Sequence, residues 1–385
     1  MPAKKVLIVH VPYETPGGEE AYVKKLGEVY RDLGLQVEFY PPVGEKTKNT
    51  IFSAFKALLP GRSLPEFEIY YERFQPDFLH LNNIHPILGP RFLRWIKNNN
   101  IFSLMTIHNH RFFCTNGLAL RQERICKACF SSRVMWRSIV YNCNQSMVKT
   151  VYHCMALSEI RYDALLEKAV KYFIAPSLYI KNELKNFGIQ ENKIKYIMHP
   201  PHVSPMGIET PEYDVVYAGR LSQEKGIQVL LESAKILPEL KFLILGSGPE
   251  EERVRQTALQ VKNITYVGQK SLHETLGYIA KAKVGVLTSI CNEILSIFCI
   301  DVFYQGKYCV VSETDSTLWM KEQEMPVIFA KSGDAEDFSR AIRGALLLPA
   351  LSDSQKEAIR KKLSPDYFKS HMKELVDCIP LAGEI

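Results

Sequence analysis

The chain has 385 residues, about two domains' worth, because single hydrophobic cores stop growing near ~250–300 residues. A composition of 46% hydrophobic and 23% charged residues excludes a disordered or collagen-like chain, and no uncharged apolar run approaches the ~20 residues of a membrane span. The nine cysteines are odd in number and irregularly spaced, unlike a secreted disulfide scaffold. We therefore expect a cytoplasmic protein.

The net charge of +6 is unevenly distributed along the chain. Residues 1–200 hold 27 Lys and Arg against 17 Asp and Glu, a net of +10, while the remainder carries −4. Residues 91–149 hold ten basic side chains and one acid, Glu123. Such a face is typical of proteins that meet anionic lipid, nucleic acid or phosphorylated substrates. No nucleic-acid-binding motif accompanies it, so we expect no nucleic acid partner. Two explanations of the basic face stay open: peripheral attachment to the inner face of an anionic membrane, and a basic surface that only meets solvent.

Short β-rich runs alternate with helical patterns, which is typical of a parallel-sheet α/β protein. A turn at residues 16–20 leads into a helix, because apolar residues from Tyr22 to Leu33 recur at helical spacing. Residues 41–75 and 109–150 lack clear periodicity. The strands predicted in the first half are residues 6–9, 37–40, 78–81, 103–107 and 174–176.

The alternation breaks at residues 198–202, and Pro205, Gly207 and Pro211 continue the break, so we place a domain boundary there. A second alternating set follows, with one helix predicted by the capping box Ser271-Leu272-His273-Glu274. The strands predicted in this half are residues 215–218, 242–245, 264–267, 284–288, 308–311 and 327–330.

In open parallel sheets, ligands bind beyond the carboxyl ends of the strands, where helix N-termini offer backbone amides. One such segment runs from Gly219 to Gly226 and carries two cations, Arg220 and Lys225. Cations beside glycines at a strand end favour phosphate binding over an ordinary surface loop. A second segment, Gly246-Ser247-Gly248, is a weak signal alone, since it also fits a tight strand-to-helix turn.

A third segment places two acids around a helix predicted over residues 294–301. Glu293 would precede this helix and Asp301 would lie inside it, and eight helical residues advance ~12 Å. That is about the reach from a hexose to a ribose across a diphosphate. Glu293 could therefore hold sugar hydroxyls and Asp301 ribose hydroxyls, although an amphipathic helix with exposed acids is the alternative. The amides expected on the phosphates are those of Leu295, Ser296 and Ile297.

In this order the motifs resemble the retaining glycosyltransferases of GT-B fold, family four, over nearly the whole chain. The resembling segments are Gly17-Gly18-x-Glu20, residues 80–83, residues 106–109, the loop 219–226 and Glu293-x7-Asp301. The resemblance implies an α/β protein of two doubly wound Rossmann-like domains facing a central cleft. Residues 1–200 would bind the acceptor and 201–365 the nucleotide sugar, while a C-terminal helix in 366–385 would cross back to the first domain.

Roles follow from the resemblance by position. Arg220 and Lys225 would neutralise the leaving diphosphate, Glu293 would contact the donor sugar, and His108 would lie beside sugar and acceptor. The sequence departs from the family pattern in two places. Asp301 is one methylene shorter than the usual Glu, and Ile294 and Ser296 stand where the family usually has glycines. The remaining positions implied in donor binding are Gly17, Gly18, Gly219, Gly246, Gly248, Leu295, Ser296, Ile297 and Asp301.

The reaction implied is transfer of a hexosyl unit, with retention of configuration, to a glycan or lipid-linked acceptor. The expected donor is a UDP- or GDP-linked sugar, and no cofactor or metal is required for catalysis. Two alternatives stay open. One is a non-transferring nucleotide-sugar enzyme of the same fold, of 2-epimerase type, and the other an inactive nucleotide-sugar- or glycan-binding protein.

A separate cysteine cluster comprises Cys114, Cys126, Cys129 and Cys143. A Cys-x-x-Cys knuckle with two flanking cysteines can hold tetrahedral zinc, but this spacing does not form two knuckles. Structural zinc is therefore less favoured than free thiols or a disulfide. The surrounding loop is basic and aromatic, which suits an acceptor at a membrane surface.

Overall fold

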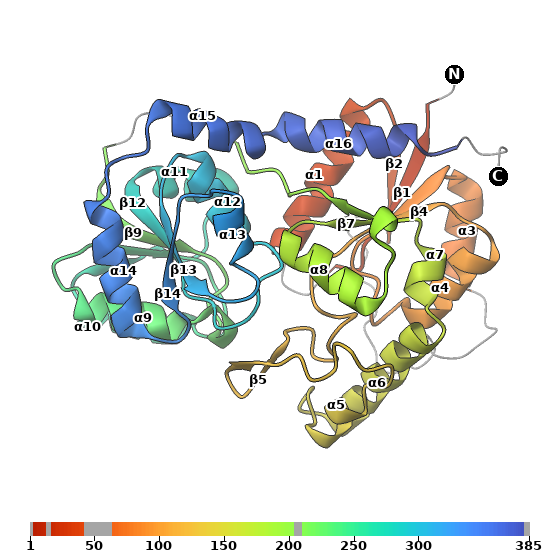
Figure 1. Cartoon of the computed structure of the whole chain (residues 1–385), viewed down its shortest axis with the longest axis horizontal. Helices are drawn as coiled ribbons and strands as arrows, with labels where there is room; N and C mark the ends of the chain where they lie inside the picture. Colours follow the sequence, from red (N-terminus) through yellow and green to blue (C-terminus); the bar gives the residue numbers. More distant parts are fainter. Residues whose placement is uncertain (1–2, 13–16, 42–63, 204–209, 381–385) are drawn as a thin grey trace. The chain divides into compact units, whose positions relative to one another are not determined.

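A computed structural model describes residues 3–12, 17–41, 64–203 and 210–380 (Figure 1). The predicted turn and boundary residues Pro16, Pro205 and Gly207 lie outside these ranges. The chain divides into two compact units. The first comprises Met1–Ala119, Cys126–Met198 and Lys369–Ile385, and the second comprises Leu120–Ile125 and His199–Phe368.

The first unit is built on a six-stranded sheet in which every neighbouring pair is parallel. Its spatial order is β2-β1-β3-β4-β7-β8, so the order reverses between β1 and β3. The five strands predicted in this half are confirmed, and β8 is an additional strand. The bounds are β1 Lys5–Val9, β2 Gln36–Tyr40, β3 Phe78–Leu81, β4 Ser103–Thr106, β7 Tyr172–Ala175 and β8 Ile194–Tyr196.

Helices pack on this sheet through apolar stripes. Helix α1 (Gly18–Asp32) buries Tyr22, Leu26, Val29 and Tyr30, which confirms the predicted helix. The segment of 109–150 that lacked periodicity folds as turns, a hairpin of two short strands (β5 Leu120–Arg121, β6 Arg124–Ile125), one short helix and the first turn of the helix that begins at Met147. The other helices of this part of the chain are α3 Pro65–Phe74, α4 Gly89–Asn98, α5 Trp136–Val140, α6 Met147–Tyr162, α7 Leu165–Ala169, α8 Leu178–Phe187 and the 3₁₀ turn η1 Glu191–Lys193.

The last helix, α16 (Pro365–Asp377), begins in the second unit, and its residues from Lys369 onward belong to the first. There Lys4 Nζ donates to the carbonyls of Val376 and Ile379, over 2.8 and 2.6 Å. These contacts satisfy carbonyls at the helix C-terminus, where cations are favourable.

The second unit contains another fully parallel six-stranded sheet, ordered β11-β10-β9-β12-β13-β14. This is the order of the doubly wound dinucleotide-binding fold, and it reverses between β9 and β12. All six predicted strands are confirmed. Their bounds are β9 Tyr213–Ala218, β10 Phe242–Leu245, β11 Ile264–Tyr266, β12 Ala282–Leu287, β13 Cys309–Glu313 and β14 Val327–Lys331.

The predicted capping box is present in the second unit, where Ser271 Oγ accepts from the Glu274 amide and Glu274 Oε2 accepts from the Ser271 amide. Buried Val, Leu, Ile and Phe side chains from the strands and from α9 and α14 form the core of this unit. The helices are η2 Gln223–Lys225, α9 Ile227–Ile236, α10 Glu251–Gln260, α11 Leu272–Ala280, α12 Ile297–Tyr304, α13 Trp319–Glu322, α14 Ala335–Leu347 and α15 Asp353–Lys362.

One cation closes the C-terminus of α11. Lys307 Nζ donates to the carbonyls of Ile279, Ala280 and Ala282. The first two carbonyls end α11 and the third begins β12, so removal of the ammonium leaves three partly buried acceptors without this donor. We predict that Lys307→Met lowers the free energy of unfolding by about 1–3 kcal/mol. Chemical denaturation followed by circular dichroism measures this, and Lys331→Met, at an exposed lysine, should change it little. Equal stability of both variants would contradict the capping role.

Candidate functional site

Three loops of the second unit follow the carboxyl ends of β9, β10 and β12. The chain leaves β9 and β12 at the point where the strand order reverses, which is where open α/β sheets bind ligands. All three loops contain residues predicted to bind a donor. The residues to place are therefore those of 219–226, 246–248 and 293–301.

The loops pack backbone against backbone at two glycines. Gly226 has φ +68°, and a Cβ there would lie 1.9 Å from the Thr288 carbonyl oxygen. Gly246 has φ +131°, and its Cβ would lie 1.8 Å from the Gly219 carbonyl oxygen. Both positions need a left-handed backbone and no side chain, so glycine is required. At Gly248 a Cβ would lie 2.3 Å from the Leu221 carbonyl oxygen. The predicted glycines therefore hold the loops together.

Lys225 and Glu293 form the central contact of this edge. Lys225 Nζ lies 2.6 and 2.8 Å from the two Glu293 carboxylate oxygens, and Ser289 Oγ also donates to Glu293 Oε1. The Glu293 amide donates to Ser316 Oγ over 2.8 Å. The side chains of Lys225 and Glu293 are 28% and 11% exposed. Burial alone would lower the pKa of the Lys225 ammonium, but Glu293 raises it above its ordinary value, so Lys225 stays charged.

Arg220 belongs to the same loop but faces solvent. The Tyr217 hydroxyl donates to the Arg220 carbonyl over 2.9 Å, which fixes the backbone, while the side chain is exposed. Within the described ranges the Arg220 guanidinium has no ion-pair partner. An exposed guanidinium on a fixed loop is available to an anionic ligand.

The helix after β12 begins later than predicted. It starts at Ile297 rather than Ile294, because Ser296 is its N-cap and Ser296 Oγ accepts from the Cys299 amide over 3.3 Å. Residues 288–296 are a loop, so the predicted eight-residue helical rise from Glu293 to Asp301 is wrong. Leu295 and Ser296 lie at the entrance of α12, beside its first amides.

Asp301 is buried and already paired. Its exposed fraction is 5%, and it accepts from the His202 amide over 2.8 Å and from His202 Nδ1 over 3.0 Å. Burial raises the pKa of the Asp301 carboxyl, and the contacts with His202 oppose that rise. The structure therefore pairs the Asp301 carboxylate with His202, whereas Lys225 pairs with Glu293. Sequence reasoning missed His202, because its partner lies 99 residues away and no local pattern links them.

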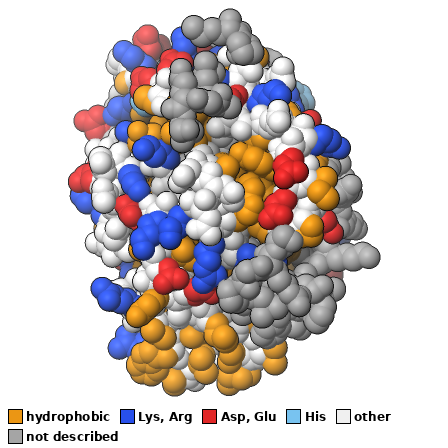
Figure 2. Space-filling view, turned by 90° about the vertical axis from the view of Figure 1, so that its right-hand side faces the viewer, with side chains coloured by type: hydrophobic (Ala, Val, Ile, Leu, Met, Phe, Trp, Pro, Cys, Tyr) orange, Lys and Arg blue, Asp and Glu red, His pale blue; other side chains and the backbone are white. Residues whose placement is uncertain are grey.

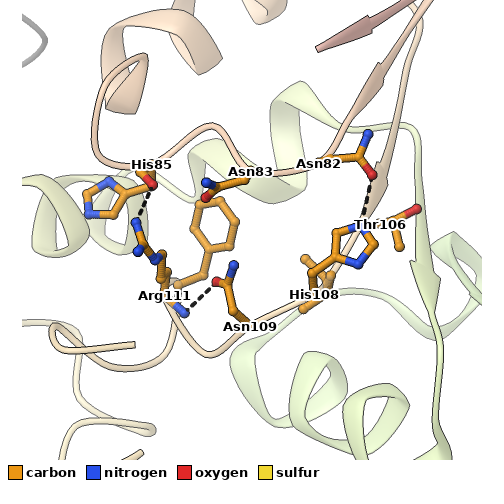
Figure 3. Close-up of a pocket in the computed structure, with 9 residues that line it drawn as sticks. Asn82, Asn83, His85, Thr106, His108, Asn109 and Arg111 are labelled. Carbon is orange, nitrogen blue, oxygen red and sulfur yellow. Dashed lines mark hydrogen bonds between the residues drawn. The ribbon is translucent and has the colours of Figure 1, made fainter. Parts of the chain in front are cut away.

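A small pocket in the first unit lies after β3 and β4 (Figure 3). His108 is one of its lining residues, and its Nε2 lies 2.8 Å from Asn82 Oδ1. Arg111 donates from its amide to Asn109 Oδ1 and from Nη1 to the His85 carbonyl, both over 3.0 Å. Side chains that can hydrogen-bond dominate the lining: Asn82, Asn83, His85, Thr106, Ile107, His108, Asn109, Arg111 and Phe112.

Helix α1 brings the other predicted residues of the first unit to this region. Gly17 is its N-cap, and Glu20 Oε2 accepts from the Gly17 amide over 2.7 Å. Tyr22 of α1 packs edge-on against His108, with ring centroids 4.7 Å apart. Glu19 accepts from Asn109 Nδ2, and burial raises the pKa of Glu19 to about 7. Gly17, Gly18 and His108 thus share one unit, whereas Lys225 and Glu293 meet in the other.

The four clustered cysteines are reduced thiols. Cys114 and Cys129 are buried, and burial raises the pKa of both thiols. Arg161 ties this region together by donating to the carbonyls of Phe112, Phe130 and Ser132. In the part of the chain that the structure describes, no group of three or more His, Cys, Asp or Glu side chains is arranged to hold a metal ion.

Most of the second unit matches a known protein family. Residues 202–362 match the family described as Glycosyl transferases group 1. The chain is 24% identical over 186 residues to the lipopolysaccharide core biosynthesis glycosyltransferase LpsD of Rhizobium meliloti (strain 1021), covering 46% of this chain and 53% of LpsD. It is 22% identical over 323 residues to the phosphatidyl-myo-inositol mannosyltransferase of Mycobacterium leprae (strain TN), covering 80% and 78%. The chain thus spans about half the length of LpsD.

Solved structures with similar folds cover nearly the whole chain. Sucrose-phosphate synthase from Thermosynechococcus elongatus has a TM-score of 0.69 at 17% identity, covering 97% of this chain and 98% of that one. Anabaena HepE in complex with UDP-glucose has a TM-score of 0.63 at 14% identity, covering 97% and 99%. The predicted architecture of two parallel-sheet Rossmann-like domains, the GT-B fold, is confirmed. Residues 202–362 are a domain of the Glycosyl transferases group 1 family.

Proposed function

We propose that the protein is a retaining glycosyltransferase that moves a hexosyl unit from a nucleotide-diphosphate sugar to a glycan or lipid-linked acceptor. The observation that carries this proposal is the Lys225–Glu293 pair at the strand-order reversal of the second unit. It sets a cation and a hydrogen-bond acceptor side by side just ahead of a helix N-terminus. A nucleotide sugar offers the complementary groups, because its diphosphate is an anion that suits the cation and its sugar hydroxyls are donors that suit the carboxylate.

In this proposal the second unit stabilises the leaving group. Lys225, Arg220 and the first amides of α12 neutralise the charge that develops on the diphosphate as the glycosidic bond breaks. Glu293 accepts hydrogen bonds from the sugar. Because its carboxylate already accepts from Lys225 and Ser289, it is a weak nucleophile. Attack by the acceptor on the face that the diphosphate leaves therefore fits these residues better than a glycosyl-enzyme intermediate.

The pocket of the first unit suits an acceptor sugar. Asn82, Asn83 and Asn109 offer amides that both donate and accept, as sugar hydroxyls require. His108 is fixed by Asn82 and Tyr22, which holds its ring in one orientation. The names of LpsD and of the mannosyltransferase support a lipid-linked glycan as the acceptor class. The HepE structures with UDP and UDP-glucose support a UDP-linked donor.

Helices α5 and α6 carry a surface that suits an anionic membrane. Figure 2 shows hydrophobic side chains gathered at the end of the face where these helices lie. The exposed fractions are 54% for Trp136, 67% for Val140 and 51% for Met147. No acidic residue occurs in the sequence between Glu123 and Glu159. We call the α5–α6 patch the exposed side chains of Trp136, Val140, Tyr141, Met147 and Val148 with the basic Arg133, Arg137 and Lys149.

The chemistry of this patch matches an interfacial contact. Trp and Tyr side chains favour the headgroup level of a bilayer, and each basic residue near an anionic leaflet contributes ~1 kcal/mol. The Arg137 guanidinium lies over the Trp136 ring, 5.6 Å from its centroid, so cation and aromatic ring face solvent together. None of the helices in the described part of the chain has the length and apolar character that crossing a bilayer requires. The proposed attachment is peripheral.

Incubation of the full chain with radiolabelled UDP- and GDP-sugars and a bacterial lipid extract tests the proposed function. Transfer of label to lipid or glycan, or slow hydrolysis of the donor, is the expected result. The anomeric configuration of the product, read by nuclear magnetic resonance, should equal that of the donor. An epimerised nucleotide sugar, or binding without turnover, would instead support one of the two alternatives.

We predict that Lys225→Ala and Arg220→Ala each lower kcat by about 10²–10³, because each removes a cation from the leaving diphosphate. Steady-state kinetics with the active donor measures the loss. Lys235→Ala is the matched control, since Lys235 pairs with Glu232 on an exposed helix face. Arg220 makes no ion pair within the described residues, so its variant should keep the melting temperature. Wild-type activity in both variants would sink the phosphate assignment.

We predict that the protein sediments with vesicles containing anionic lipid at low salt, and much less at high salt. The double variant Trp136→Ser/Val140→Ser should bind about tenfold more weakly, because two exposed apolar side chains are lost from the contact. Leu347→Ser is the control, since Leu347 is 85% exposed on α14 of the second unit. The proposed membrane attachment would be contradicted if binding did not depend on lipid charge, or if the double variant bound as strongly as the wild type.

A further inference from the structure

Both oxygens of the Asp301 carboxylate accept hydrogen bonds from one residue, His202. His202 donates to it twice, from its backbone amide to Oδ1 over 2.8 Å and from its ring Nδ1 to Oδ2 over 3.0 Å. The Asp301 side chain is 6% exposed, whereas the His202 side chain is 21% exposed. The His202 ring is therefore more accessible to a ligand from solvent than the Asp301 carboxylate is.

The pairing also defines the chemistry that the ring presents. A carboxylate only accepts hydrogen bonds, so the proton of the His202 ring is held on Nδ1. When the ring carries this single proton, the other nitrogen, Nε2, has a lone pair that accepts a hydrogen bond from a hydroxyl group. Two contacts to one carboxylate fix both the backbone and the ring, so Nε2 is held in one direction.

The position of the pair relates it to the proposed donor. Glu293, which pairs with Lys225, precedes the N-cap of α12 in the sequence, and Asp301 lies on the second turn of that helix. In the proposed binding mode the sugar is held at Glu293 and the diphosphate lies at the N-terminus of α12. The ribose, which follows the diphosphate, would then lie toward His202 and Asp301. The ribose offers vicinal hydroxyl groups, which are donors to a neutral imidazole nitrogen.

We propose that His202 Nε2 accepts a hydrogen bond from a ribose hydroxyl of the donor nucleotide and that Asp301 is a positioning residue that orients His202. This inference rests on the proposed function. It also explains why Asp301 can be one methylene shorter than the usual Glu: the aspartate orients His202, and His202 contacts the ribose.

Binding of probes with and without ribose hydroxyls tests the inference. Isothermal titration calorimetry on the full chain would use UDP and GDP, their 2′,3′-dideoxy forms, and inorganic pyrophosphate. For the ribonucleotide that binds, His202→Ala should raise the dissociation constant about tenfold, the typical value of one hydrogen bond. The same variant should leave the dissociation constants of the dideoxy nucleotide and of pyrophosphate unchanged. Asp301→Asn should give a smaller loss, again confined to the ribonucleotide.

The control variant His273→Ala, at an exposed histidine of α11, should bind all probes like the wild type. Melting temperatures of all variants separate a loss of contact from a loss of fold. Equal weakening of ribonucleotide, dideoxy nucleotide and pyrophosphate by His202→Ala would make the pair purely structural and overturn the inference. Unchanged ribonucleotide binding in His202→Ala would also overturn it. Failure of the wild type to bind UDP or GDP at all would contradict the proposed function itself.

Discussion

The ion pair between Lys225 and Glu293 is the contact around which the second unit arranges its loops. It joins the loop after β9 to the loop after β12, the two strands at which the sheet order reverses. The loops can come this close because Gly226 presents only backbone to the Thr288 carbonyl. A partly buried pair gains from a low local dielectric but is costly to break on one side, so each partner fixes the position of the other.

Both units have polar side chains beyond the carboxyl ends of their parallel strands, but the side chains differ in chemistry. In each sheet the order reverses once, between β1 and β3 in the first unit and between β9 and β12 in the second. The pocket after β3 and β4 of the first unit is lined mainly by amides and imidazoles, with one cation, Arg111, and amides and imidazoles suit neutral hydroxyl groups. The loops at the second reversal carry the cations Arg220 and Lys225 and lead to a helix N-terminus, which suits an anion. The proposed division between acceptor and donor rests on this difference.

The sequence predicted the strands well because buried parallel strands are short β-branched runs that need no distant partner to be recognised. The loop 219–226 at the end of β9 was also predictable as a loop, since glycines beside cations at a strand end have a local signature, and its binding of phosphate stays a prediction. The start of α12 was not, because the choice of Ser296 as N-cap depends on the loop that packs around it. The His202–Asp301 contact and the pairing of Glu19 with Asn109 join distant residues, so no local pattern contains them.

Hydrogen–deuterium exchange of the full chain, with and without UDP or GDP, tests most directly whether these loops bind the nucleotide diphosphate. Amides that contact phosphate, or that are held by a bound diphosphate, exchange more slowly. The account predicts slower exchange in residues 219–226 and 288–299, with little change in β13 and β14, whose amides are already protected by the sheet. Saturating nucleotide that leaves both loops unchanged, or that protects only the first unit, would contradict it.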